Sequence, residues 1–151
     1  MTRYRAEIEW RNTGPDFAGN RYSRGHEWRF DGGAVVPASA SPENVPPPWS
    51  DPRGVDPEEA LVAAASSCHM LWFLGLAAEA GYTVERYRDA AEGVMGVAPG
   101  GRIAITRITL RPEIGFAGAA PDAAIVASLH EAAHERCFVA ASLIAEIVIE
   151  S

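Results

Sequence analysis

The stretch DPEEALVAAASSCHMLWFLGLAAEAGY, residues 56–82, decides how the rest of the chain must be arranged. Asp56 suits the cap of a helix, Pro57 suits its first position, and the two acidic residues that follow complement the helix dipole. Gly81 suits the left-handed turn with which many helices end. The stretch therefore predicts one long helix over about residues 56–80.

Apolar residues surround this predicted helix on nearly every side. One stripe contains Leu61, Ala64, Cys68, Leu71, Trp72, Gly75 and Leu76, and further apolar residues lie outside it at Val62, Met70, Phe73 and Leu74. A helix that is apolar all round has to be covered all round. Because a chain of 151 residues offers few other elements, we expect a second copy to provide cover in a homodimer.

Before the helix, alternation of apolar and polar residues predicts two strands, each with one buried face. The first has Tyr4, Ala6, Ile8 and Trp10 on its apolar face, and the second covers the stretch HEWRFDGG from His26. Residues 37–55 contain six prolines. Since proline removes a backbone donor and restricts the residue before it, we expect a long loop there.

After the helix, two apolar segments flank a Pro-Gly-Gly turn and predict a β-hairpin. The apolar phase of its second arm changes from odd to even positions, which predicts a β-bulge near Thr106. A second helix is expected to begin at Pro121. A final strand then places Ala145, Ile147 and Ile149 on one face. Strands, helix, hairpin, helix and strand in this order indicate an α+β protein.

Composition limits the classes of function. The length fits a single domain over residues 1–151, and a net charge of -7 disfavours nucleic acid as a partner. No apolar run approaches the length needed to cross a bilayer, and the N-terminus does not resemble a signal peptide. We therefore expect a cytoplasmic protein that does not act at a membrane.

The stretch SLHEAAHERCFVA, residues 128–140, contains the H-E-x-x-H spacing of zinc proteases. On a helix His130, His134 and Cys137 would share one side and could bind a metal ion. The third ligand that a zinc protease needs is absent after the motif. Two histidines on a solvated helix face are the alternative, and His69 is either a further ligand or a hydrogen-bonded core residue.

The chain has two cysteines, Cys68 in the long helix and Cys137 at the end of the second helix. In a cytoplasmic protein two thiols serve chemistry or are buried and inert, and their spacing leaves both readings open.

The stretch VDPEEALVAAASSCHM, residues 55–70, resembles the segment NPEELLAAAHAACF of the OsmC/Ohr family, the osmotically inducible and organic hydroperoxide resistance proteins. AHERCFVAASLIAEIVIE, residues 133–150, is similar to that family's second cysteine motif and closing strand. The order of elements agrees, so the resemblance covers essentially the whole chain and is strongest to an OsmC-like branch.

The resemblance implies an OsmC-like fold, with antiparallel sheets packed around a long central helix, in an intertwined homodimer. It also implies a thiol peroxidase that reduces organic hydroperoxides without a cofactor or metal and is regenerated by a dithiol reductant. Cys68 corresponds to the peroxidatic cysteine and Cys137 to the resolving one. Glu58 corresponds to the family's glutamate and Arg24 to its arginine, with Arg21 as a rival.

Glu58 lies ten residues before Cys68, roughly 15 Å along a helix. We therefore expect Glu58 and Arg24 to pair and to serve the Cys68 of the other subunit. Two alternatives stay open: a non-catalytic OsmC-like protein that binds a small apolar ligand between its central helices, and a metal-binding protein that uses His130, His134 and Cys137. Phe138 departs from the proline that follows the second cysteine in better-known members of the family.

Overall fold

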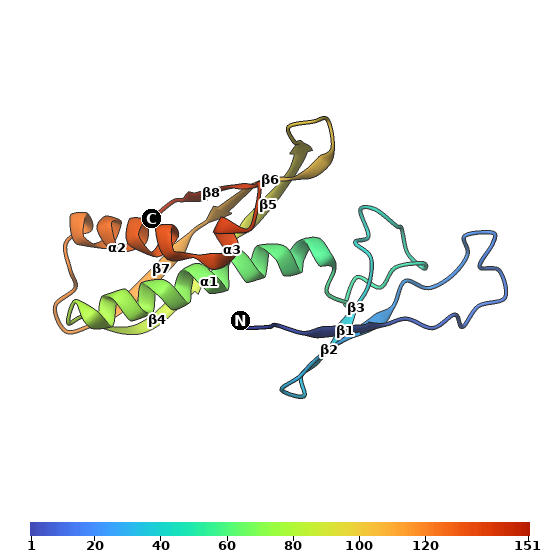
Figure 1. Cartoon of the computed structure of the whole chain (residues 1–151), viewed down its shortest axis with the longest axis horizontal. Coiled ribbons are helices and arrows are strands. Elements are labelled where there is room, and N and C mark those ends of the chain that lie inside the picture. Colours follow the sequence, from blue (N-terminus) through green and yellow to red (C-terminus); the bar gives the residue numbers. More distant parts are fainter. The chain divides into compact units, whose positions relative to one another are not determined.

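The computed structural model describes all 151 residues and has the expected α+β architecture, with antiparallel sheets and one long helix. The chain forms two compact units, Met1–Ala60 and Leu61–Ser151. Figure 1 labels the elements of each unit. The first unit contributes strands and loops, and the second carries most of the helical structure.

The first unit contains a three-stranded antiparallel sheet made of β1 (Ala6–Glu9), β2 (His26–Phe30) and β3 (Val35–Ala38), with β2 in the centre. β1 and β2 confirm the two predicted strands. β3 was not predicted, because Pro37 placed it at the start of the expected loop. The proline is tolerated since β3 is an edge strand, whose outer side needs no ladder hydrogen bonds.

The predicted burial of the first strand's apolar face is wrong for the single chain. Tyr4 is 90% exposed and Ile8 is 59% exposed. Ala38 is the only apolar residue of this unit among the fully buried core residues. The physical reason is that the unit has no second layer of its own to pack on the sheet. The alternation of apolar and polar residues therefore predicted the strand correctly, but it could not predict what would cover the apolar face.

The long helix α1 (Pro57–Glu79) begins and ends where the sequence predicts. The Asp56 carboxylate accepts a hydrogen bond from the Glu59 N–H at 2.8 Å, and the Glu59 carboxylate accepts one from the Asp56 N–H at 3.2 Å, which is a capping box. Gly81 has a φ of 85°, and its N–H and that of Tyr82 bond to carbonyls of the last turn. A Schellman-type turn therefore ends the helix.

The buried stripe of α1 differs from the predicted one. It consists of Ala65, His69, Phe73 and Ala77, spaced four residues apart. Leu71 of the predicted stripe is 62% exposed. The prediction was wrong because apolar residues surround the helix, so the periodicity of the sequence does not show which side is buried. By length and composition α1 would also pass for a membrane-spanning helix, contrary to our expectation, as core helices of soluble proteins do.

The second unit contains two small sheets. β4 (Thr83–Asp89) pairs antiparallel with β7 (Pro112–Ala117), and β5 (Glu92–Val97) pairs antiparallel with β6 (Ile103–Leu110). Gly100 and Gly101 both have positive φ in the predicted hairpin turn. Val94 pairs with Arg107 and Met95 with Ile105, so Thr106 is the extra residue of the predicted bulge.

The closing strand β8 (Glu146–Ile149) pairs in parallel with β6, a departure from the all-antiparallel expectation. The chain between them includes α2 (Ala123–Arg136) and α3 (Phe138–Ala141), long enough for the crossover that parallel strands need. α2 begins at Ala123 and not at Pro121, as predicted, and the Asp122 carboxylate caps it by accepting a hydrogen bond from the Ile125 N–H. Ala145, Ile147 and Ile149 join one core cluster, as predicted.

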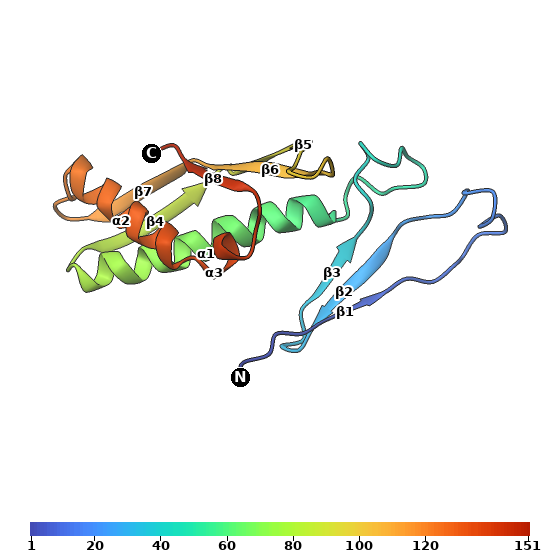
Figure 2. The ribbon, with the colours of Figure 1, turned by 45° about the horizontal axis from the view of Figure 1, so that its top comes forward.

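Helices α1 and α2 pack on the strands of the second unit and on each other, as Figure 2 shows. One core cluster joins the first half of α1 to β6 and β8, and the other joins its second half to α2, β4 and β7. Asp89 links these layers, because its carboxylate accepts from the Ser66 hydroxyl and from the Arg111 N–H. The packing thus fixes the part of α1 that carries Cys68 against the end of α2.

Candidate functional site

The two cysteines meet between α1 and the junction of α2 with α3. Cys68 is half-buried on α1, Cys137 is 2% exposed, and both are free thiols. Burial raises the pKa of Cys137, and a side-chain interaction with Cys68 raises it further. The two thiols are therefore neighbours in the fold.

Cys137 occupies a position that its backbone defines closely. It ends α2, where its N–H bonds to the His134 carbonyl, and it also begins α3. Its Sγ accepts a hydrogen bond from the Ala140 N–H at 3.4 Å. Backbone N–H groups stabilise a thiolate, so they oppose the effect of burial on the Cys137 pKa. The thiol is protonated at rest and has donors in place for the charged form.

An aromatic pair adjoins the two thiols. Trp72 follows Cys68 by one helical turn and Phe138 follows Cys137 directly, and their rings meet edge to face at 5.5 Å. Phe138 is 70% exposed, and the Arg136 guanidinium lies 5.8 Å from the Trp72 ring. Phe73, the next residue along α1, is fully buried in a core cluster. An apolar surface therefore borders the thiols on one side.

Arg24 lies in the first unit, on the segment that leads into β2. Its guanidinium stacks at 3.6 Å on the Tyr22 ring and donates to the carbonyl of Tyr22 and the side chain of Asn20. It has no carboxylate partner. Arg21, in contrast, is held by Asp16 at 2.7 Å. Of the two candidate arginines, Arg24 is the one whose charge is not already neutralised.

Glu58 lies in the first turn of α1 and is also part of the first unit. Its Oε1 accepts a hydrogen bond from the Asn44 amide at 3.2 Å, while its Oε2 is buried without a partner. The single chain forms no ion pair between Glu58 and Arg24, contrary to the expected pairing. The physical reason is that Asn20 and Tyr22 already occupy the guanidinium in its own loop.

The H-E-x-x-H stretch does not assemble a metal site. His130 is 3% exposed and points into the core, whereas His134 is exposed on the surface. Nowhere in the chain do three or more His, Cys, Asp or Glu side chains gather in a way that could hold a metal ion. The reading of both histidines as solvated is correct for His134 and wrong for His130.

The fold gives His130 a partner that sequence reasoning did not assign. His69 Nε2 and His130 Nδ1 are 3.0 Å apart, and the two rings lie nearly parallel. Burial is the main cause that lowers the pKa of both, that of His69 to about 4. The available signal was the spacing of four residues that puts His69 between Ala65 and Phe73.

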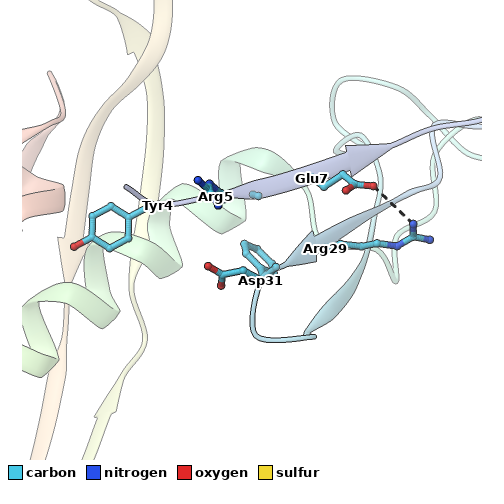
Figure 3. A pocket seen from close by; sticks show the side chains of 7 residues that line it. Tyr4, Arg5, Glu7, Arg29 and Asp31 are labelled. Carbon is cyan, nitrogen blue, oxygen red and sulfur yellow. Dashed lines mark ion pairs between the residues drawn. The ribbon is translucent and has the colours of Figure 1, made fainter. Parts of the chain in front are cut away.

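A hollow of about 630 Å³ lies elsewhere, on β1 and β2 of the first unit, and is drawn in Figure 3. Tyr4, Arg5 and Asp31 line it together with Arg29, which pairs with Glu7 at 3.9 Å. Further carboxylates also surround Arg29. Its charge is therefore already balanced, and the hollow contains none of the predicted site residues.

With the dithiol pair and the order of elements established, comparison with known proteins identifies the family. The family described as OsmC-like protein matches residues 50–151 of the chain. The chain belongs to the OsmC-like family. An OsmC-like protein of unknown function from Vibrio cholerae is 45% identical over 99% of both chains, with a TM-score of 0.96.

Other OsmC-like structures share the fold at low identity. An organic hydroperoxide resistance protein OsmC from Legionella pneumophila is 12% identical with a TM-score of 0.65, over 99% of this chain and 95% of its own. The organic hydroperoxide resistance protein OhrB of Bacillus subtilis is 17% identical with a TM-score of 0.67, over 97% of each chain. Among curated proteins none is similar enough to count as a match.

Proposed function

We propose that this OsmC-like protein is a thiol-dependent peroxidase that reduces organic hydroperoxides. The observation that carries the proposal is that two free thiols, Cys68 and Cys137, are neighbours where α1 meets the end of α2, so that Cys68 adds to the effect of burial on the Cys137 pKa. Membership of a family with named hydroperoxide resistance proteins supports it. A structural role alone does not require two free thiols side by side, one of them with access to solvent.

In this proposal the half-buried Cys68 is the thiol that attacks the peroxide. Its thiolate attacks the O–O bond of the hydroperoxide, so that the sulfur becomes a sulfenic acid and the organic part leaves as an alcohol after it gains a proton. Cys137 then attacks the Cys68 sulfur, which releases water and forms the disulfide. A dithiol reductant then returns both cysteines to thiols.

We place Arg24 and Glu58 at the same reaction. A guanidinium beside Cys68 would stabilise the thiolate and the negative charge on the leaving oxygen. A carboxylate would orient that guanidinium. Because Arg24 and Glu58 do not pair within one chain, the proposal assigns them to the Cys68 of the partner subunit, with Arg24 preferred to Arg21. The unpaired Oε2 of Glu58 supports a partner for it beyond its own chain.

The aromatic surface beside the thiols supports an organic substrate. Trp72 and Phe138 can bury the apolar part of an alkyl or aryl hydroperoxide, which hydrogen peroxide lacks. The chain is further proposed to be a single OsmC-like domain that works as a cytoplasmic homodimer, in keeping with the exposed apolar residues on α1 and β1. Neither nucleic acid nor a membrane enters this reaction.

The test is to add one equivalent of cumene hydroperoxide to reduced, chelator-treated protein and to measure intact mass and free thiols. Loss of both thiols with a mass decrease of about 2 Da is expected, because two hydrogens leave when a disulfide forms. Cys137→Ser should stop at a Cys68 sulfenic acid that dimedone traps, and Cys68→Ser should not react. Hydrogen peroxide should react more slowly than cumene hydroperoxide.

Thiols that stay unchanged with cumene hydroperoxide would contradict the proposal and favour an OsmC-like protein that binds an apolar ligand without catalysis. Equal or faster reaction with hydrogen peroxide would contradict the assigned substrate class alone. Arg24→Gln should slow sulfenic acid formation by at least about tenfold if one charge contact to the leaving oxygen is lost, whereas Arg21→Gln is the matched control.

A further inference from the structure

The second unit contains a buried histidine pair that the peroxidase reaction does not use. His69 on α1 is 1% exposed and His130 on α2 is 3% exposed, and their Nε2 and Nδ1 atoms are 3.0 Å apart. The Phe73 ring lies 4.4 Å from His130. Because the side chains on this face of α1 are otherwise apolar, the pair forms a specific polar contact between the two helices.

The geometry requires one histidine of the pair to donate and the other to accept. With both rings neutral, a single N–H lies between Nε2 of His69 and Nδ1 of His130. Removing one partner would leave the other buried and unsatisfied, which is unfavourable, whereas replacing both with apolar groups is nearly neutral for stability. The pair therefore favours one relative placement of α1 and α2.

The thiol pair and the histidine contact both lie where α1 meets α2 and its end. On α1 the two residues are adjacent, Cys68 and His69. On the other side His130 lies within α2 and Cys137 follows directly after its last residue. His130 and Cys137 lie seven positions apart in the sequence, about 10 Å along a helix. Because a helix moves largely as a rigid body, any displacement of α2 at His130 would displace Cys137 by about the same amount.

We propose that His69 and His130 are positioning residues that hold Cys137 against Cys68 for disulfide formation. The catalytic meaning of this proposal rests on the proposed peroxidase function. The positioning itself does not, because any oxidant that accepts two electrons and two protons from the thiols can form the same disulfide. Neither histidine needs to touch the reacting sulfur atoms.

Several ionisable groups surround the pair and share its electrostatic environment. His134 from α2 adds to the effect of burial on the His69 pKa, and Asp89 from β4 opposes it. Tyr87, also on β4, packs on Phe73 with its hydroxyl buried. β7 contributes the apolar side chains Ile114 and Phe116. If both histidines became charged they would be donors only, and the N–H···N bond between them would be lost.

Two double variants separate positioning from packing. His69→Leu with His130→Leu keeps an apolar core and removes the hydrogen bond. His69→Gln with His130→Asn keeps a hydrogen bond, because the Gln amide reaches the place of Nε2 and the Asn amide that of Nδ1, and it removes titration. The measurement is the rate of the Cys68–Cys137 disulfide after diamide is added to reduced protein, followed by intact mass over a range of pH.

At neutral pH the Leu pair should form the disulfide at least about tenfold more slowly than the natural chain, the rate change that the loss of one hydrogen bond can cause. The Gln and Asn pair should restore most of the rate. As the pH falls toward about 4, the lowered pKa of His69, the natural chain should slow relative to the Gln and Asn pair, whose thiols are the same.

An unchanged rate in the Leu pair, no rescue by the Gln and Asn pair, or parallel pH profiles of that pair and the natural chain would each overturn the proposal. If the Leu pair does not fold, the pH comparison decides. A disulfide formed with diamide but not with cumene hydroperoxide would reject the peroxidase function and leave the positioning proposal standing. Absence of the disulfide with diamide in the natural chain would reject the positioning.

Discussion

His69 illustrates how a single residue can link the core to solution conditions. Its pKa is lowered from 6.5 to about 4, mainly by burial and then by the neighbouring His130. The unfolded chain takes up this proton near pH 6.5, whereas the folded chain does so only near pH 4. The unfolded state therefore binds more protons between these values, and the folded state loses stability as pH falls through that window.

We expect acidification from about pH 7 to about pH 5 to lower the free energy of unfolding by about 2 kcal/mol, because over this range the unfolded chain takes up the His69 proton and the folded chain does not. The His69→Gln and His130→Asn pair should show a shallower dependence, because neither amide takes up a proton. Urea unfolding at several pH values measures both. Equal slopes in the two proteins would contradict this origin of the acid sensitivity.

Among individual residues, the sequence singled out the two cysteines but not the contacts that the residues around the site make. Resemblance singled out Cys68 and Cys137, and the fold brings them together. The contact between His69 and His130 spans 61 positions in the chain and lacks a local signal. Similarly, the Asn20 and Tyr22 contacts that occupy Arg24 depend on the shape of one loop, which no periodic pattern encodes.

Among the elements, α1 has the best-defined ends. At its start, Asp56 satisfies a helix N–H that would otherwise lack a partner. Asp56→Ala should lower the free energy of unfolding by about 1 kcal/mol, whereas Asp56→Ser, which can still accept this bond, should have a smaller effect. Urea unfolding compares the two. Equal losses would show that the cap does not contribute through this hydrogen bond.

At the other end of α1, Gly81 adopts a φ of 85°, where a side chain is strained. No atom lies within 4 Å of an added Cβ, so the strain comes from the backbone alone. Gly81→Ala should lower the free energy of unfolding by about 1–2 kcal/mol. Gly81→Asn should cost less because asparagine tolerates this conformation. Thermal unfolding of both variants checks the order, and a reversed order would contradict it.

Elements that short sequence patterns mark were predicted correctly. Elements whose position depends on pairing with distant segments of the chain were not. The capping residues predicted where α1 begins and ends, and the change in the phase of apolar residues predicted the bulge at Thr106. The edge strand β3 was missed because proline argues against strands in general, although an edge permits it. The parallel pairing of β6 with β8 follows from the path of α2 and α3, which propensity does not contain. The prediction of which side of α1 is buried was wrong, because apolar residues surround the helix and no side stands out in the sequence.

For the molecule as a whole, the main feature is apolar surface that the single chain does not cover. Leu71 on α1, Ile8 on β1 and Ile144 before β8 are all more than half exposed. Isolated apolar side chains on a surface are common, but here they include Leu71 on α1 and one large apolar residue on each strand of the N-terminal sheet, Ile8, Phe30 and Val35. A second copy of the chain is the partner that we propose for them.

Leu71→Asp should convert a dimer into a monomer or weaken it strongly, since a charge buried in an apolar interface is unfavourable. Sedimentation velocity or light scattering after size-exclusion chromatography measures the change. Ala124→Asp places the same charge on an exposed position of α2 and is the matched control. A natural chain that is monomeric at high concentration would contradict the prediction.

The first unit has only one buried apolar residue, Ala38, and this sets how its folding responds to dilution. A three-stranded sheet with so small a core gains too little from burial to outweigh the ordering of its own backbone. If a second chain supplies the missing contacts, mass action enters the folding equilibrium, and the melting temperature rises with protein concentration. The abundance of the protein would then determine how much of its N-terminal part is folded at any moment.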